Sequence, residues 1–132
     1  MLERLDELIN QQVDFAFETT LSTKSFASLC RKAKIQGYTV YLVFLWLDSP
    51  SLAFERVRQR VLEGGHNIPE ETVLRRYTRG VKNFHNLYKN IVDYWLFFDN
   101  SETNQELIAE GRFGEPDQVY NIQQWQKIKE YA

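Results

Sequence analysis

The sequence predicts an α/β fold in which helices flank a parallel β-sheet. The run Tyr38–Leu47 is a near-continuous series of aromatic and β-branched residues, which is typical of a strand covered on both faces. Val13–Glu18 precedes it as a shorter strand-like run, and the helical pattern between the two completes a strand–helix–strand unit. Tyr94–Asp99 has the same buried character and predicts a third strand.

Composition indicates a single globular domain, residues 1–132, because 43% of the residues are apolar and 14% are aromatic. A net charge of −2 argues against a nucleic-acid partner. The longest apolar run, Tyr38–Leu47, is too short to cross a bilayer, so we expect no membrane association. Cys30 is the only cysteine, and it lies in the apolar stripe of a helix, so we expect a buried structural thiol and a reducing, cytoplasmic setting.

Helical periodicity and capping residues place the remaining elements. Residues 2–11 form an amphipathic helix that starts directly after Met1 without a capping side chain, so we expect a segment to precede it. Ser22 caps a helix from Thr23 to Gln36. After the third strand, we expect a short hairpin of Leu107–Ala109 with Gln118–Tyr120. A closing helix over 121–131 then turns three apolar side chains inward: Ile122, Trp125 and Ile128.

A helical hairpin at about residues 50–91 carries most of the concentrated positive charge. Ser49 and Pro50 start its first helix, Gly64-Gly65 end that helix, and Pro69 opens the second. Residues 56–82 hold seven Lys and Arg against three Glu, a local charge of +4. Two arginine-bearing faces could clamp a polyanion through paired guanidinium–phosphate hydrogen bonds. On charge alone, a solvated surface whose arginine stems cover apolar area is the simpler interpretation.

Polar residues follow each predicted strand, at the edge where parallel sheets bind ligands. These strand ends offer carboxylates and hydroxyls suited to a phosphorylated ligand and Mg²⁺: Glu18-Thr19-Thr20, Asp48-Ser49 and Asp99-Asn100-Ser101. Equally, Glu18 and the two threonines could only end a strand and cap the next helix. No Gly-x-x-x-x-Gly-Lys-Ser/Thr loop is present, and the two histidines lie nineteen residues apart without metal-ligand neighbours, so we expect no metal site.

Four stretches together resemble the zeta-toxin-like P-loop kinases. They are Phe15–Ser22 (FAFETTLS), Gly37–Val61, Gly64–Phe84 (GGHNIPEETVLRRYTRGVKNF) and Phe97–Ser101 (FFDNS), within a similarity that runs from Glu3 to Ser101. Members of this group are small ATP-dependent kinases, and the best known phosphorylate UDP-N-acetylglucosamine. The resemblance implies a P-loop kinase-like parallel sheet, with the hairpin as a lid over the nucleotide phosphates and with ATP and Mg²⁺ as cofactors.

The resemblance also implies roles for individual residues. Arg60 and Arg76 match the lid arginines that neutralise the transferring phosphate. Glu18 and Thr20 match the acid and hydroxyl that face the acceptor, a small molecule such as a nucleotide sugar. The remaining matches are nucleotide-binding, three as rivals for the lid role and one as the adenine-side wall: Arg56, Arg75, Arg79 and Asn100.

The family's phosphate loop, its catalytic Asp and its central P-loop strand have no counterpart in these 132 residues. We therefore expect the chain to resemble the C-terminal two thirds of such a kinase and, by itself, to bind no cofactor and be inactive. Without the central strand, Val13–Glu18 and Tyr38–Leu47 must pair directly or leave an open edge that invites homodimer formation. The alternative function is a non-catalytic module that binds a phosphate ligand or oligomerises. A metal-assisted phosphate-ester hydrolase using Glu18 is a weaker third reading, because no ligand cluster accompanies that residue.

Overall fold

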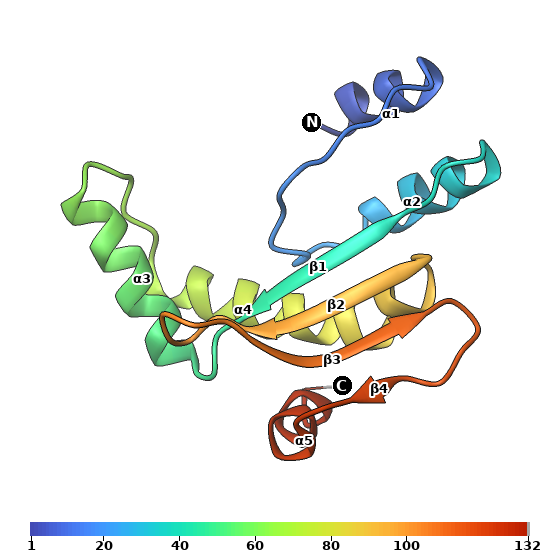
Figure 1. Cartoon of the computed structure of the whole chain (residues 1–132). Coiled ribbons are helices and arrows are strands. Elements are labelled where there is room, and N and C mark those ends of the chain that lie inside the picture. Colours follow the sequence, from blue (N-terminus) through green and yellow to red (C-terminus); the bar gives the residue numbers. More distant parts are fainter. Residues whose placement is uncertain (132) are drawn as a thin grey trace.

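A computed structural model describes residues 1–131. Within these residues, five α-helices and four strands follow one another (Figure 1), with one 3₁₀ turn at Tyr88–Asn90. The order is α1 Leu2–Asn10, α2 Phe26–Ile35, β1 Tyr41–Trp46, α3 Pro50–Leu62, α4 Glu70–Asn86, β2 Tyr94–Asp99, β3 Glu106–Arg112, β4 Gln118–Val119 and α5 Ile122–Lys129.

The sheet has the strand order β1-β2-β3-β4 and is mixed. β1 and β2 run parallel from Tyr41↔Tyr94 to Trp46↔Asp99, connected through the α3–α4 hairpin. β3 and β4 are both antiparallel to their neighbours, so the expected parallel sheet is confirmed only for β1 and β2. β3 runs antiparallel to β2 because its short connection from β2 allows only a hairpin-like return. The hairpin expected near residues 107–120 is present as β3 and β4.

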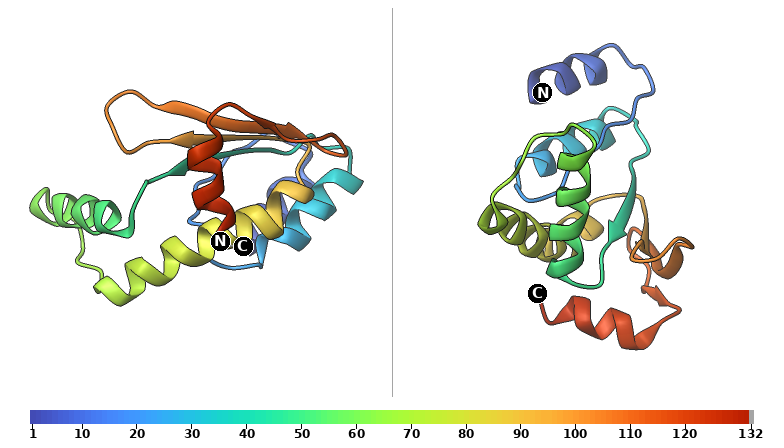
Figure 2. Two further views of the ribbon diagram at one scale, coloured as in Figure 1. Left: turned by 90° about the horizontal axis from the view of Figure 1, so that it is seen from below. Right: turned by 90° about the vertical axis from the view of Figure 1, so that its left-hand side faces the viewer.

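Helices α2, α4 and α5 lie on one face of the sheet (Figure 2), and within residues 1–131 no helix covers the other face. The core between them contains Phe84 of α4, Trp95 and Phe97 of β2, and Trp125 and Ile128 of α5. Along β1, side chains alternate between exposed positions on the open face and partly or fully buried positions on the helix-covered face. The expectation that Tyr38–Leu47 is covered on both faces is therefore wrong.

Val13–Glu18 does not form the predicted strand. No backbone hydrogen bond joins this segment to β1, and Val13 and Phe17 remain 41% and 37% exposed. Its aromatic rings pack instead on side chains, Phe15 against Tyr38 and Phe17 against Phe26. The predicted strand is therefore wrong, and aromatic contacts rather than a hydrogen-bonded ladder hold this mostly exposed segment. Because Val13–Glu18 does not pair with β1, the edge of β1 stays open, which is the second of the two outcomes expected from the missing central strand.

The predicted helical hairpin is present. The Ser49 hydroxyl accepts a hydrogen bond from the Leu52 amide at 3.3 Å, and Pro50 occupies the first turn of α3. α3 has no buried residue and projects away from the sheet (Figure 1), whereas α4 runs from the hairpin tip into the core, where Val81 and Phe84 are buried.

Three smaller expectations need correction. α2 begins later than predicted, with Ser25 rather than Ser22 at the cap position. Ile122 is 67% exposed because it begins α5 at the solvent side, although Trp125 and Ile128 are buried as expected. Cys30 is only half-buried, and burial raises the pKa of its thiol above the ordinary value, as for a structural cysteine. None of the helices formed by residues 1–131 combines the length and apolarity needed to cross a membrane.

Candidate functional site

Helix α4 holds the segment that contains Glu18 and Thr20. At Gly80 the helix approaches so closely that an added Cβ would lie 2.5 Å from the Thr20 carbonyl oxygen. One turn further on, the buried Asn83 side chain donates a 2.8 Å hydrogen bond to the Leu21 carbonyl oxygen. These two contacts fix residues 20–21 along one face of α4, although no strand precedes them.

Arg76 lies one turn before Gly80 on the same side of α4, since residues four apart share a helical face. Thr20, which Gly80 contacts, belongs to an exposed segment that also carries Glu18. The Thr20 and Ser22 hydroxyls are 2.8 Å apart, so the segment presents two mutually bonded hydroxyls beside a carboxylate. The structure thus holds the backbone of Thr20 against α4 at Gly80, one helical turn after Arg76.

The other hairpin arginines differ in what they contact. Arg58 pairs with Glu70 at 3.1 Å and so joins α3 to α4 near the hairpin tip. Of the hairpin arginines, four form neither an ion pair nor a side-chain hydrogen bond within residues 1–131: Arg60, Arg75, Arg76 and Arg79. All four are exposed. Their donors are therefore available to an anionic ligand.

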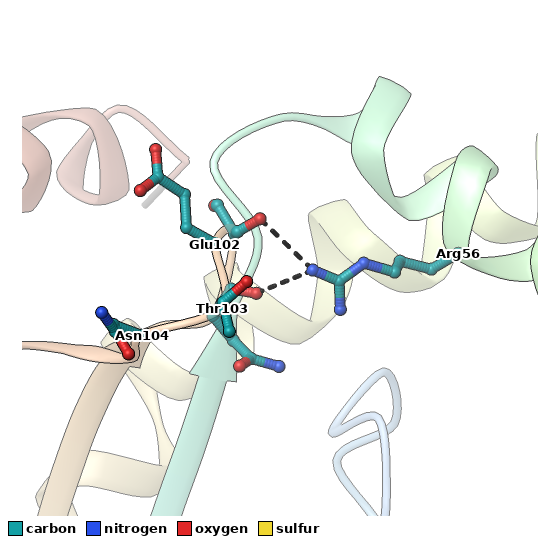
Figure 3. A pocket seen from close by; sticks show the side chains of 6 residues that line it. Arg56, Glu102, Thr103 and Asn104 are labelled. Atoms are coloured by element: carbon teal, nitrogen blue, oxygen red, sulfur yellow. Dashed lines mark hydrogen bonds between the residues drawn. The ribbon is translucent and has the colours of Figure 1, made fainter.

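Arg56 and Asn100 meet at a polar pocket of about 620 Å³ (Figure 3). The Arg56 guanidinium donates to the carbonyl oxygens of Asn100 and Ser101 at 3.0 and 3.3 Å. This contact anchors α3 to the loop after β2. The pocket is further lined by Glu102, Thr103 and Asn104. Arg56 thus has part of its donor capacity already satisfied, unlike the four arginines above.

The carboxyl ends of β1 and β2 lie side by side, as predicted for parallel neighbours. The Asp48 amide donates to the Ser101 hydroxyl at 2.8 Å, and the Asp99 carboxylate accepts from the Ser101 amide at 2.9 Å. Lys127 of α5 pairs with Asp48 at 3.0 Å. These acids are engaged by protein groups, and across residues 1–131 no three His, Cys, Asp or Glu side chains gather as a metal site would require.

Two aromatic residues with polar atoms, Tyr77 and Trp46, lie near the end of β1. The Tyr77 hydroxyl donates to the Leu47 carbonyl oxygen at 2.6 Å, and burial raises the pKa of Tyr77 far above its ordinary value. Trp46 is 1% exposed, and its indole nitrogen finds no hydrogen-bond partner within residues 1–131. Tyr77 therefore remains protonated at physiological pH and serves as a donor that fixes α4 to the end of β1.

Gly80 and Asn83 were not among the residues singled out from the sequence. An isolated glycine inside a long helical pattern was the available signal, because such a residue costs helix stability unless a close approach requires it. Asn83 carried no comparable signal, since exposed asparagines are common in helices.

Comparison of the sequence with known protein families identifies relatives of this chain. The sequence profile of the zeta toxin family matches residues 1–109. The chain belongs to the zeta toxin family. A kinase-like function and a dependence on ATP and Mg²⁺ are general features of this family.

The chain is also similar to a protein of Haemophilus influenzae strain Rd that is described only as uncharacterized. The two are 35% identical over 69 residues, which are 52% of this chain and 49% of the relative. The match therefore spans about half the length of this curated relative. No solved structure matches the chain.

Proposed function

We propose that these residues form the lid and acceptor-facing part of an ATP-dependent kinase that phosphorylates a hydroxyl of a small molecule, with a nucleotide sugar as the substrate class. The observation that supports this most directly is the seating of residues 20–21 on α4 at Gly80 and Asn83. This contact holds the Thr20 backbone against the helix that carries Arg75, Arg76 and Arg79, which supports a site shared by these arginines and the Glu18–Thr20 segment.

The proposed arrangement provides groups for both the transferring phosphate and the acceptor hydroxyl. Arg76 and Arg60 would bind the oxygens of the transferring phosphate, because guanidinium groups stabilise the charge that is spread over those oxygens. Glu18 would accept a hydrogen bond from the acceptor hydroxyl and orient it, with Thr20 as a second contact. Arg75 and Arg79 would contact the nucleotide phosphates, and Arg56 with Asn100 would border the nucleoside.

The 132 residues fit only part of a Mg·ATP site. They supply arginines, but no phosphate-cradling glycine loop and, within residues 1–131, no group of three His, Cys, Asp or Glu side chains that could hold the metal. Mg·ATP, when bound, would supply the phosphoryl group and charge neutralisation at its terminal phosphates. We therefore propose that the chain as printed does not transfer phosphate by itself.

A chimera tests this function. The chain is fused behind the phosphate-loop segment of an active zeta toxin family kinase, and ATP-dependent phosphorylation of a nucleotide sugar is measured. We expect activity in the fusion and none in the 132-residue chain alone. Arg76→Ala should lower kcat in the fusion by about 10²-fold or more, as for other removed charge-stabilising donors. The matched control is Arg58→Ala, which removes an exposed arginine already paired with Glu70.

A folded, monodisperse fusion without activity would contradict the kinase proposal. Activity in the 132-residue chain alone would contradict the proposed need for a phosphate loop. Equal losses in Arg76→Ala and Arg58→Ala would show that general charge, rather than the place of Arg76 beside Thr20, matters.

The four unpaired arginines also favour a second candidate, a non-catalytic module that binds a phosphate ligand. Inorganic tripolyphosphate would then bind the chain alone, and binding would weaken as salt rises because guanidinium–phosphate contacts at the surface are screened. A titration of the 132-residue chain at 50 and 300 mM salt measures this directly. Binding without any activity in the fusion would favour this module over the kinase.

A further inference from the structure

Residues at the end of α5 lie against the base of the α3–α4 hairpin (Figure 2). The Tyr131 ring, just after α5, is edge-on to the Tyr77 ring of α4, with 5.8 Å between the ring centres. One turn earlier, the Lys127 ammonium pairs with the Asp48 carboxylate at 3.0 Å. Asp48 directly precedes Ser49, which caps α3. The end of α5 therefore contacts both α4 and the turn that leads into α3.

Tyr77 attaches the arginine-bearing half of α4 to the end of β1. Of residues 70–79, only Val73 is buried. The Tyr77 hydroxyl donates to the Leu47 carbonyl oxygen at 2.6 Å, directly after β1. Tyr131 packs on the same side chain. The end of β1 and the end of α5 thus meet at one residue of α4.

The helical position of Tyr77 relates it to the hairpin arginines. Successive residues of an α-helix are rotated by about 100°, so Arg75 and Arg79, two positions before and after Tyr77, project from roughly the opposite side of α4. Arg76, directly before Tyr77, lies between these two directions. The contacts that hold Tyr77 therefore also fix the rotation of α4 about its axis, and with it the direction in which these three arginines point.

We propose that α5 positions the hairpin arginines for phosphate binding, through the contact of Tyr131 with Tyr77 and through the Lys127–Asp48 pair. These four are positioning residues, which act through the arginines and not on the ligand. The inference rests on the proposed phosphate-binding role of the hairpin. It goes beyond the family match, which covers residues 1–109 and so does not include α5. A loosened hairpin would keep its arginines but would spend less time in the binding orientation, which lowers the apparent affinity in proportion.

Calorimetric titration of inorganic tripolyphosphate into the full 132-residue chain at low salt tests the proposal. Tyr131→Ala should weaken binding about fivefold or more, whereas Tyr131→Phe keeps the ring contact and should stay within about twofold of the unchanged protein. Tyr77→Phe should weaken binding about fivefold, because its hydrogen bond to Leu47 is lost. Tyr120→Phe is the matched control, since Tyr120 is 56% exposed and its hydroxyl bonds Gln118.

Two lysines of α5 separate the ion pair from general charge. Lys127→Ala and Lys129→Ala each remove one positive charge, but within residues 1–131 only Lys127 forms an ion pair. Lys127→Ala should weaken tripolyphosphate binding about twofold more than Lys129→Ala, as expected for an exposed pair. Equal losses in the two variants would remove the Lys127–Asp48 pair from the proposal.

Hydrogen exchange gives a readout that general destabilisation would not reproduce. In Tyr131→Ala, amides of residues 70–79 should exchange about fivefold faster or more, with those of residues 81–86 unchanged. Binding that Tyr131→Ala and Tyr77→Phe retain would overturn this inference alone. Weaker binding with a uniform rise in exchange would also overturn it, since the variants would then be only less stable. No binding by the unchanged chain at millimolar tripolyphosphate would instead contradict the phosphate-binding role of the hairpin itself.

Discussion

Gly80 is the residue on which the geometry of the candidate site depends most closely. Its hydrogen side chain allows α4 to approach the Thr20 carbonyl oxygen, and every larger residue would meet that oxygen at 2.5 Å. Since the contact is with backbone rather than with the end of a flexible side chain, relief requires a shift of α4 or of residues 18–21. Arg76 and Thr20 would separate as a consequence.

Gly80→Ala should therefore destabilise the chain. An ordinary exposed helical position would gain about 1 kcal/mol from this change, but overpacking typically costs about 1–3 kcal/mol. We expect a net loss of about 1–2 kcal/mol, measured by urea denaturation. Asn86→Ala, an exposed position in the same helix, is the control and should change stability by less than about 0.5 kcal/mol. A stabilised Gly80→Ala variant would show that the close approach is absent.

His85 should make stability fall as the solution is acidified. Burial lowers its pKa below the ordinary value, with Lys89 and Lys129 adding repulsion and Asp117 opposing them. Its Nδ1 atom is buried without a hydrogen-bond partner in residues 1–131, and its ring packs edge-on against Trp125. Because the unfolded chain binds this proton more readily, folding stability decreases as pH falls below about 6.5.

The measurement is the urea midpoint at pH 7.5, 6.5 and 5.5. His85→Phe should flatten the pH dependence over this range, whereas His66→Gln, in the exposed turn of the hairpin, should leave it as in the unchanged protein. The same slope in all three proteins would contradict the assignment to His85.

At the scale of elements, α3 and α4 differ in how they are held. α3 buries no residue and is attached through its Ser49 cap, Arg56 and the Arg58–Glu70 pair. The C-terminal half of α4 lies in the core. A helix with few buried contacts opens locally at a much lower free energy than the global unfolding of the chain.

Hydrogen exchange should therefore show two levels of protection in the hairpin. Amides of α3 should exchange at least about 10²-fold faster than those of residues 81–86, a difference of about 2.7 kcal/mol or more in opening free energy. Mass spectrometry of peptides from 50–62 and 78–88 measures both. Equal protection would show that α3 is part of the cooperative core and would remove the basis for a mobile lid.

Elements with strong local signals were predictable from the sequence. Ser49-Pro50 and Gly64-Gly65 defined α3, and the run Tyr94–Asp99 gave β2 with its bounds. The failures concern non-local packing. Whether Val13–Glu18 pairs as a strand depends on the free edge of β1, and whether Tyr41 or Val43 is covered depends on what lies over the sheet. Periodicity within a segment does not contain that information.

At the scale of the whole molecule, the described helices α2, α4 and α5 cover one face of the sheet and leave the other face exposed. The α3–α4 hairpin carries the four unpaired arginines. The sequence identified the arginines, but the contact between α4 and Thr20 at Gly80, which joins residues sixty apart in the chain, is visible only in the structure.

Calorimetric titration of Mg·ATP into the 132-residue chain tests the phosphate-binding role of the hairpin most directly. The sequence alone predicted no cofactor for this chain, but the four exposed, unpaired hairpin arginines lead us to expect weak, salt-sensitive binding. We expect a dissociation constant of about 1 mM or somewhat below, equivalent to about −4 kcal/mol. Arg76→Ala and Arg60→Ala should each reduce the affinity by about tenfold, and Arg58→Ala should not. Binding that all three variants reduce equally, or no heat from the unchanged chain at millimolar ligand, would contradict a phosphate-binding site between α4 and residues 18–21.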